Sequence, residues 1–290
     1  MKNALHTHTE LLGLIGHPIK HTFSPMMHNV ASQLLDLDYL YLPFDISHAD
    51  LSEGIAGLKV LGFKGFNVTV PHKEAIFSLL DTVSEEAVII GAVNCVVNDG
   101  GTLHGYNTDA FGVHYVLDTY REEITGSPVM IFGAGGASRS AVYTLIRHYR
   151  PSVIHIVNRT IQRAEQIALH FKQQMHYDGI VAHEQEPVTT DNIMKSCKLI
   201  INTTTLGMTP LTEDSPVSSA AGFTDNQIVF DMVYNPVNTQ FLQMAESQGA
   251  ITVGGIKMLV AQGAKSFELW TGKQMPVNEI YDTLLKYLNP

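Results

Sequence analysis

One stretch of this sequence, residues 129–140, constrains the fold more than any other. It begins with the apolar run Val129–Phe132, which has the length and content of a buried parallel strand. It then passes through Gly133-Ala134-Gly135-Gly136 into residues that predict a helix over 137–149. A strand that enters a helix through a glycine turn is typical of an α/β fold with a parallel sheet.

The glycines of this stretch predict a ligand site as well as a turn. Gly133 and Gly135 allow a tight turn and let backbone N–H groups approach an anion at the positive end of the helix. This is typical of a dinucleotide pyrophosphate site, and a glycine turn that only shapes the backbone is the alternative. Ser138 stands at the third small position of G-x-G-x-x-G/A, so the packing of helix on strand must accommodate a hydroxyl. The residues predicted to contact the pyrophosphate are Gly133, Ala134, Gly135, Gly136, Ala137 and Ser138.

The next apolar run, 153–157, indicates which dinucleotide is bound. It ends in Asn158-Arg159-Thr160, where a Rossmann unit carries an Asp or Glu that binds the adenosine ribose 2′-hydroxyl. No acid is present here. Arg159 and Thr160, with Arg163 one turn further on, instead offer hydrogen-bond donors suited to a 2′-phosphate. We therefore expect NADP rather than NAD as the cofactor, with a solvated arginine at a helix start as the alternative.

Composition excludes several other classes of protein. The chain of 290 residues is long enough for two domains, and its net charge of −10 argues against a nucleic-acid partner. Cys95 and Cys197, the only cysteines, form no C-x-x-C pair, which fits a reducing cytosol. The 14 histidines form no H-E-x-x-H motif, so we expect no metal. No apolar stretch reaches about 18 residues and no signal-peptide core is seen, so we expect a cytoplasmic protein without membrane contact.

The order of apolar runs and helical patterns predicts two α/β domains. The alternation before residue 120 makes one unit and restarts at Val129, so the boundary lies near the helix that begins at Asp109. Expected strands cover Glu10–Gly16, 39–44, 63–70, 92–97, Val129–Phe132, 153–157, 198–202, 227–232 and Ile251–Val253. Expected helices begin at Ser24, Leu51, Pro71 and Asp109, and cover 137–149, 256–270 and Val277–Leu288. The last two helices have no strand partners, so we expect residues 256–290 to complete a substrate domain formed by residues 1–109. We expect residues 110–255 to form a doubly wound Rossmann-type domain.

Together the motifs resemble one family, the shikimate dehydrogenases and the related quinate/shikimate dehydrogenases, over nearly the whole chain. The segments that carry this resemblance are GHPIKHTFSPMMHN (16–29), GFNVTVPHKE (65–74), GAVN (91–94), NTD (107–109), GAGGASR (133–139), NRT (158–160) and GAKSFELWTG (263–272). The resemblance implies reversible reduction of 3-dehydroshikimate to shikimate with NADPH, a step of aromatic amino acid biosynthesis.

The resemblance assigns proton transfer to Lys73 and Asp109. Hydride departure from a carbinol carbon needs a partner that takes the hydroxyl proton, and we expect Lys73 to be this general acid/base, with Asp109 orienting it. Lys73 falls near the third position of the helix opened by Pro71, whose positive end favours the neutral amine. Asp109 begins another helix, which favours its carboxylate. The alternatives are a surface lysine and an N-terminal Asp cap.

The resemblance also supplies the substrate residues. Thr22 and Ser24 match the two hydroxyl positions of the family's H-S-x-S-P loop and are expected to bind the substrate carboxylate, although Ser24 also fits a helix N-cap. The family usually has serine at the first position, and the methyl group of Thr22 opens the site toward quinate. The residues expected at the ring hydroxyls are Thr69, Asn94, Asp109, Tyr234 and Gln262. An ordinary turn and an ordinary helix face are the alternatives for Asn94 and Gln262. Further expected cofactor residues are Thr203, Met232, Gly255 and Met258.

Two rival functions stay open at this point. The first is an NAD-linked quinate/shikimate dehydrogenase of catabolism, against which Arg159 argues. The second is a non-catalytic dinucleotide-binding sensor on the same fold, against which the presence of both Lys73 and Asp109 argues. We expect a monomer or a homodimer.

Overall fold

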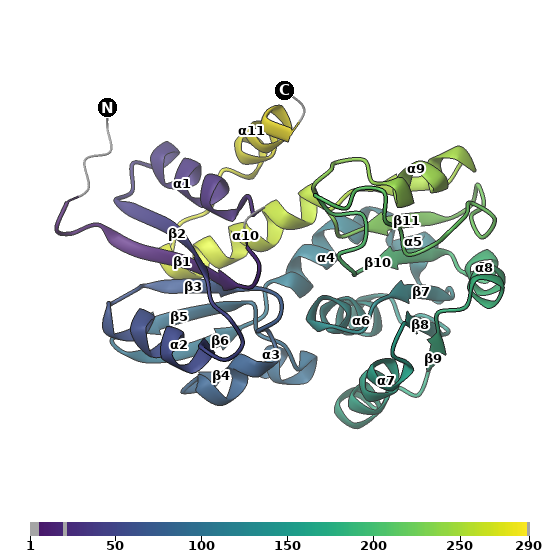
Figure 1. Cartoon of the computed structure of the whole chain (residues 1–290), viewed down its shortest axis with the longest axis horizontal. Coiled ribbons are helices and arrows are strands. Elements are labelled where there is room, and N and C mark those ends of the chain that lie inside the picture. Colours follow the sequence, from purple (N-terminus) through teal and green to yellow (C-terminus); the bar gives the residue numbers. More distant parts are fainter. Residues whose placement is uncertain (1–5, 20–21, 289–290) are drawn as a thin grey trace. The chain divides into compact units, whose positions relative to one another are not determined.

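The computed structural model describes residues 6–19 and 22–288, which form two compact units (Figure 1). Of the described residues, 6–19, 22–108 and 260–287 form unit 1, and 109–259 with Leu288 form unit 2. Each unit is an α/β structure with a six-stranded sheet. The predicted fold class is therefore confirmed, and the two units are described one after the other.

The sheet of unit 1 is mixed and has the strand order β2-β1-β3-β5-β6-β4. Its strands are β1 (Glu10–Gly16), β2 (Tyr39–Asp45), β3 (Gly65–Val68), β4 (Thr82–Val83), β5 (Cys95–Asp99) and β6 (Thr102–Tyr106). β1 runs parallel to β2 and β3, whereas β5 runs antiparallel to β3 and β6. Because of this reversal, the residues that follow β1, β3 and β6 lie at the same edge of the sheet as those that precede β5.

The helices of unit 1 come from both ends of the chain. They are α1 (Ser24–Leu34), α2 (Leu51–Val60), the 3₁₀ helix η1 (Ala75–Leu79), α3 (Glu85–Ile90), most of α10 (Ile256–Thr271) and nearly all of α11 (Val277–Leu288). Trp270 of α10 is buried and donates from Nε1 to the Val96 carbonyl oxygen at 2.9 Å. The expectation that the C-terminal helices return to the first part of the chain is thus confirmed.

The segment after β3 differs from the prediction. Pro71 opens no α-helix: residues 71–74 form turns, and the short 3₁₀ helix η1 begins at Ala75. A proline that fixes φ is as useful in a turn as at the first position of a helix, so this signal was ambiguous. The sequence pattern also missed β4 and α3, whose two and six residues are too short for a periodicity to appear.

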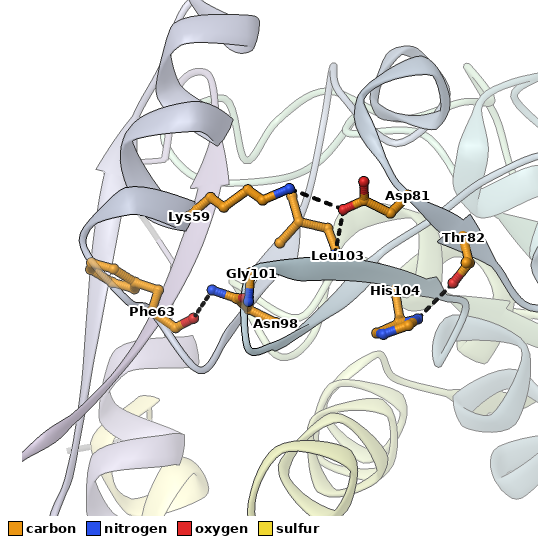
Figure 2. A network of polar contacts seen from close by, with 8 residues as sticks. All are labelled: Lys59, Phe63, Asp81, Thr82, Asn98, Gly101, Leu103 and His104. Atoms are coloured by element: carbon orange, nitrogen blue, oxygen red, sulfur yellow. Dashed lines mark hydrogen bonds and ion pairs between the residues drawn. The ribbon is translucent and has the colours of Figure 1, made fainter.

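Polar contacts hold the outer strands of this sheet (Figure 2). Asp81 accepts hydrogen bonds at Oδ2 from Lys59 Nζ at 3.1 Å and from the Leu103 backbone N–H at 2.8 Å. Thr82 Oγ1 lies 2.6 Å from His104 Nδ1, so β4 is tied to β6 by side chains as well as by its ladder. The Leu103 N–H, followed by the Lys59 ammonium, lowers the pKa of the Asp81 carboxyl. These contacts fix the edge of the sheet away from β1 and β3.

Unit 2 contains a parallel sheet with the order β12-β11-β10-β7-β8-β9. Its strands are β7 (Val129–Phe132), β8 (Ile154–Asn158), β9 (Ile180–Glu184), β10 (Leu199–Asn202), β11 (Ile228–Asp231) and β12 (Ile251–Val253). This is the doubly wound Rossmann order: β8 and β9 follow on one side of β7, β10, β11 and β12 follow on the other, and the strand order switches between β7 and β10. The sequence pattern predicted every one of these strands except β9.

Both faces of this sheet are covered by helices and buried apolar side chains. The helices are α4 (Asp109–Leu117), the 3₁₀ helix η2 (Asp118–Tyr120), α5 (Arg121–Ile124), α6 (Gly136–His148), α7 (Ile161–Met175), α8 (Pro187–Ser196) and α9 (Gln240–Ser247), followed by the start of α10. Ile131 faces one apolar cluster and Met130 the other, as alternation along a strand requires. Among the described residues, no helix has the length and apolar content needed to span a membrane.

Candidate active site

The glycine turn after β7 has the geometry of a site for an anion. Gly133 has a φ of 100°, and a Cβ there would come within 2.7 Å of Thr203 Oγ1. Both observations require glycine at this position. A Cβ at Gly135 would meet no atom within 4 Å, so the space beside this residue is open. α6 begins directly after it, at Gly136, with no side-chain cap, and the N–H groups of a first helical turn have no partner within the helix.

Ser138 lies in the first turn of α6 and is completely buried. Its Oγ has no hydrogen-bond partner among the described residues. The structure therefore does accommodate a hydroxyl at the third small position of the motif, but it leaves that hydroxyl unsatisfied. An unpaired buried hydroxyl lowers stability.

The residues expected at the adenosine end lie together at the start of α7. Asn158 ends β8 and donates from Nδ2 to the Thr160 carbonyl oxygen at 2.8 Å. Arg159, Thr160 and Arg163 are exposed, and the first turn of α7 contains no acidic residue. Two guanidinium groups and a helix N-terminus thus make this end of the sheet suited to a phosphate group.

The other expected cofactor residues follow the carboxyl ends of β10, β11 and β12. Thr203 donates from Oγ1 to the Phe132 carbonyl oxygen at 2.6 Å, which fastens it beside the glycine turn. The Met232 N–H donates to the Asn202 carbonyl oxygen at 3.0 Å. A Cβ on Gly255 would lie 2.5 Å from the Met232 carbonyl oxygen, so only glycine fits there. Met258 is buried in the core, and Tyr234 is half-buried in the loop after β11.

In unit 1, Thr22 and Ser24 lie together at the start of α1. Thr22 Oγ1 is 3.3 Å from Ser24 Oγ and also accepts the Ser24 backbone N–H at 3.3 Å. Ser24 is the first helical residue, the N-cap is Phe23, and no side chain caps the helix. The capping role that the sequence offered as an alternative for Ser24 is therefore not used.

A buried polar network in unit 1 contains Asn94 and Gln262. Asn94 Nδ2 lies 2.9 Å from Thr108 Oγ1 and 3.3 Å from Gln262 Oε1. The Thr108 backbone N–H donates to Asn94 Oδ1 at 2.6 Å, and Thr108 Oγ1 lies 3.0 Å from Ser266 Oγ. Asn67 donates to the same Ser266 oxygen at 3.0 Å. These contacts join α10 to the edge of the sheet where β3 ends and β5 begins.

Three residues of this network, Asn67, Thr108 and Ser266, were not among the predicted site residues. All three are at most 5% exposed. Asn67 and Thr108 lie within the motifs GFNVTVPHKE and NTD, so a buried polar residue inside a recognised motif was the available signal. Ser266 lies within the motif GAKSFELWTG, one turn after Gln262, and so carried the same signal.

Thr69 and Lys73 lie in the segment that follows β3. The Thr69 N–H donates to the Ile15 carbonyl oxygen at 2.9 Å, and a Cβ on Gly16 would come within 2.4 Å of the Thr69 methyl group. The Lys73 carbonyl oxygen accepts the Val93 N–H at 2.8 Å, which places Lys73 next to the segment that carries Asn94. Thr69, Lys73 and Asn94 therefore lie at one edge of the sheet.

The expectation about the backbone at Lys73 is wrong. Lys73 lies in a turn before η1 and not in the first turn of an α-helix. Asp109 does begin a helix, α4, and is 6% exposed. Lys73 belongs to unit 1 and Asp109 to unit 2, so the distance between their charged groups stays a prediction.

Strand order, glycine turn and the donors after β8 together define unit 2 as a dinucleotide-binding Rossmann domain, attached to a second α/β unit that carries the polar cluster. No group of three His, Cys, Asp or Glu side chains suited to a metal ion occurs among residues 6–19 and 22–288.

The particular family follows from comparison with known proteins. Residues 14–96 match the family model of the shikimate dehydrogenase substrate binding domain, residues 117–240 that of shikimate / quinate 5-dehydrogenase, and residues 255–285 that of the shikimate 5′-dehydrogenase C-terminal domain. Over 269 residues the chain is 41% identical to the shikimate dehydrogenase (NADP(+)) of Carboxydothermus hydrogenoformans, an alignment that covers 93% of this chain and 94% of that protein. The chain belongs to the shikimate dehydrogenase family, as its motifs predict.

Solved structures agree with this assignment. A crystal structure of a shikimate dehydrogenase in complex with NADP+ matches with a TM-score of 0.89 at 34% identity, covering 98% of both chains. A quinate dehydrogenase from Corynebacterium glutamicum in complex with NAD matches with a TM-score of 0.86 at 29% identity, covering 96% of this chain and 99% of that one. The family thus includes proteins named for either substrate.

Proposed function

We propose that this protein is an NADP-dependent shikimate dehydrogenase that reversibly reduces 3-dehydroshikimate to shikimate. The observation that carries this proposal is the pairing of two sites in one chain of this family. Unit 2 has the glycine turn with basic donors at its adenosine end, and unit 1 has a buried cluster of neutral hydrogen-bonding groups. We assign substrate binding to 1–109 with 256–290 and cofactor binding to 110–255.

The cofactor supplies the hydride when it is bound, and the protein has to hold the cofactor in a fixed position. Open space beside Gly135 and the N-terminus of α6 fit a pyrophosphate. Arg159 and Arg163, exposed at the start of α7, fit a 2′-phosphate, which distinguishes NADP from NAD. The residues that hold the rest of the cofactor are Asn158, Thr160, Thr203, Met232, Gly255 and Met258.

Lys73 donates the proton that the carbonyl oxygen of 3-dehydroshikimate gains on reduction, and it takes that proton back in the reverse reaction. Asp109 orients the Lys73 amine and the reacting hydroxyl. Thr22 and Ser24 bind the substrate carboxylate with hydroxyl donors, which gives directional recognition without a cation. The ring hydroxyls contact Thr69, Asn94, Gln262 and Tyr234, whose amide and hydroxyl groups both donate and accept.

The decisive experiment follows reduced-cofactor absorbance with shikimate or quinate, each tried with NADP and with NAD. We expect the shikimate and NADP combination to give the highest kcat/KM. Lys73→Met should reduce kcat by at least about 100-fold while NADPH binding stays unchanged, because general acid–base catalysis contributes about 10²–10⁴-fold. Turnover within a few-fold of wild type in Lys73→Met would refute the role assigned to Lys73.

Quinate is the second candidate substrate. The threonine at position 22 and the likeness to a quinate dehydrogenase structure favour it. In the four-way assay, a higher kcat/KM for quinate with NAD would replace the first proposal by this one. Cofactor binding without turnover in any combination would instead favour a non-catalytic sensor.

We also propose a cytoplasmic location and a monomeric or homodimeric state. Cys95 and Cys197 are buried thiols that are not joined in a disulfide, which suits a reducing compartment. Light scattering on the purified protein measures the oligomeric state directly, and a tetramer or larger species would contradict the proposal.

A further inference from the structure

A buried carboxylate lies at the carboxyl end of β11, outside the residues assigned above. Asp231 is completely buried, and its Oδ1 accepts hydrogen bonds from Asn202 Nδ2 at 2.9 Å and from the Val233 N–H at 3.0 Å. Its Oδ2 accepts from Thr239 Oγ1 at 2.6 Å. Among the described residues, none of these partners is a cation. A carboxylate buried in this way needs a reason other than an ion pair.

The carboxylate determines which way the Asn202 amide faces. An ionised carboxylate only accepts hydrogen bonds, so Asn202 must present its nitrogen to Asp231. Its oxygen then faces the loop after β10 and accepts the Thr204 N–H at 3.0 Å and the Thr204 hydroxyl at 2.7 Å. The Leu206 N–H donates to that hydroxyl at 3.2 Å. The shape of residues 203–207 therefore depends on Asp231.

The same carboxylate organises the loop after β11. Its bond to the Val233 N–H sets the start of this loop, residues 232–239. Thr239, held at Oδ2, is also the N-cap of α9 and accepts the Leu242 N–H at 3.3 Å. Both ends of this loop are thus fastened to one side chain.

The two loops belong to the cofactor site. In the Rossmann order, β7, β8 and β9 serve the adenosine nucleotide, so the half formed by β10, β11 and β12 serves the nicotinamide nucleotide. Thr203 packs against Gly133, and Met232 packs against Gly255, at contacts too close for any side chain in place of the glycines. A small shift of either loop would therefore displace the cofactor.

We propose that Asp231 is a positioning residue for hydride transfer, which holds the loops after β10 and β11 in the arrangement that binds the nicotinamide half of NADP. This inference rests on the proposed function. Burial raises the pKa of Asp231 to about 6, and its hydrogen bonds oppose that rise. The group is thus ionised at neutral pH, as an acceptor-only role requires.

The test is Asp231→Asn, which keeps the shape and removes the acceptor-only character. We expect the KM for NADPH to rise about tenfold, the effect of weakening one charge-assisted hydrogen bond, while the KM for 3-dehydroshikimate changes less than about twofold. Asp225→Asn is the control. Asp225 is exposed in the turn before β11, and this substitution removes the same negative charge as Asp231→Asn. Its kinetics should match wild type.

The outcomes separate this inference from the proposed function. If wild type itself does not oxidise NADPH with 3-dehydroshikimate, the proposed function fails. If wild type is active and Asp231→Asn keeps the wild-type KM for NADPH, with or without a lower melting temperature, Asp231 is a structural residue only and the inference is overturned. If Asp231→Asn does not fold, Thr239→Val decides, because it removes one bond to Oδ2. A raised KM for NADPH in Thr239→Val that Thr239→Ser restores supports the inference, and an unchanged KM refutes it.

Discussion

His28 should make the stability of unit 1 fall steeply in mild acid. His28 lies in α1 and its side chain is completely buried. The centroid of its ring lies 4.4 Å from that of the stacked Tyr41 ring and 5.2 Å from that of the Trp270 ring. Neither ring nitrogen has a hydrogen-bond partner among the described residues. Burial lowers the pKa of His28 to about 3, and the neighbouring Asn67 side chain acts in the opposite sense by less. The native state therefore keeps this ring neutral.

The size of the effect follows from proton linkage. The unfolded chain binds a proton at His28 below about pH 6.5, whereas the native state does so only near pH 3. Stability from this residue is therefore complete above about pH 7 and is lost as the pH falls toward 3. The loss is about 2 kcal/mol at pH 5 and about 5 kcal/mol in total, at about 1.4 kcal/mol for each pH unit.

The perturbation is His28→Phe, which keeps an aromatic ring against Tyr41 and removes the titration. Urea unfolding at pH 7.5 and pH 5.0 is followed by the fluorescence of Trp270, the only tryptophan, which reports on unit 1. Relative to wild type, His28→Phe should gain about 2 kcal/mol on going from pH 7.5 to 5.0. The comparison cancels any constant packing cost of the larger ring.

The control is His8→Phe, because His8 is exposed in the same unit and its ring is solvated in both states. This variant should follow the wild-type pH dependence. Burial also lowers the pKa of His155 and of His183, both in unit 2. Wild type and both variants contain these two histidines, so their effect on stability cancels in the comparison. If His28→Phe and wild type lose stability in parallel between pH 7.5 and 5.0, the argument from burial is wrong.

Three further changes test the cofactor site. Arg159→Ala should lower the ratio of kcat/KM with NADP to kcat/KM with NAD by about 10- to 100-fold, because one charge-assisted hydrogen bond to a phosphate contributes about that much. An unchanged ratio would show that Arg159 does not bind the cofactor. Gly255→Ala should cost about 1–3 kcal/mol of stability and weaken NADPH binding, because its methyl group would overlap the Met232 carbonyl oxygen. Gly57→Ala, in a helix with no atom within 4 Å of the new methyl group, should do neither and serves as its control. Ser138→Ala should raise the free energy of unfolding by about 1 kcal/mol in urea titrations, since it removes a buried hydroxyl without a partner, and a loss of stability would mean that this hydroxyl is bonded.

The Rossmann domain was predictable because its signals are local. Val129–Phe132 is apolar throughout, as a strand covered on both faces must be, and the glycines follow at once. Each later strand of that sheet that the sequence predicted is also a short apolar run. The sequence pattern missed β9 because this strand, which contains Val181 and His183, lies at the edge of the sheet, where exposed positions do not require apolar residues.

The sequence proposes residues for the candidate substrate site but does not predict the contacts between them. The family motifs point to Asn94 and Gln262, which are 168 positions apart in the chain, yet no local pattern predicts that they share Thr108. Such contacts depend on how α10 returns to unit 1, and periodicity carries no information about that. The turn at Lys73 shows the same limit at short range, because Pro71 suits a helix start and a turn equally well.

Asp231 illustrates why the missed residues matter for function. In the sequence it is one acid among many at a strand end, and helix and strand patterns assign it no role. In the structure its carboxylate dictates the direction of the Asn202 amide, and that amide in turn shapes the loop that begins with Thr203. The motif residues are those proposed to contact ligands. The loops that hold them depend on buried acceptors such as Asp231, which can be identified only once hydrogen-bond partners are known.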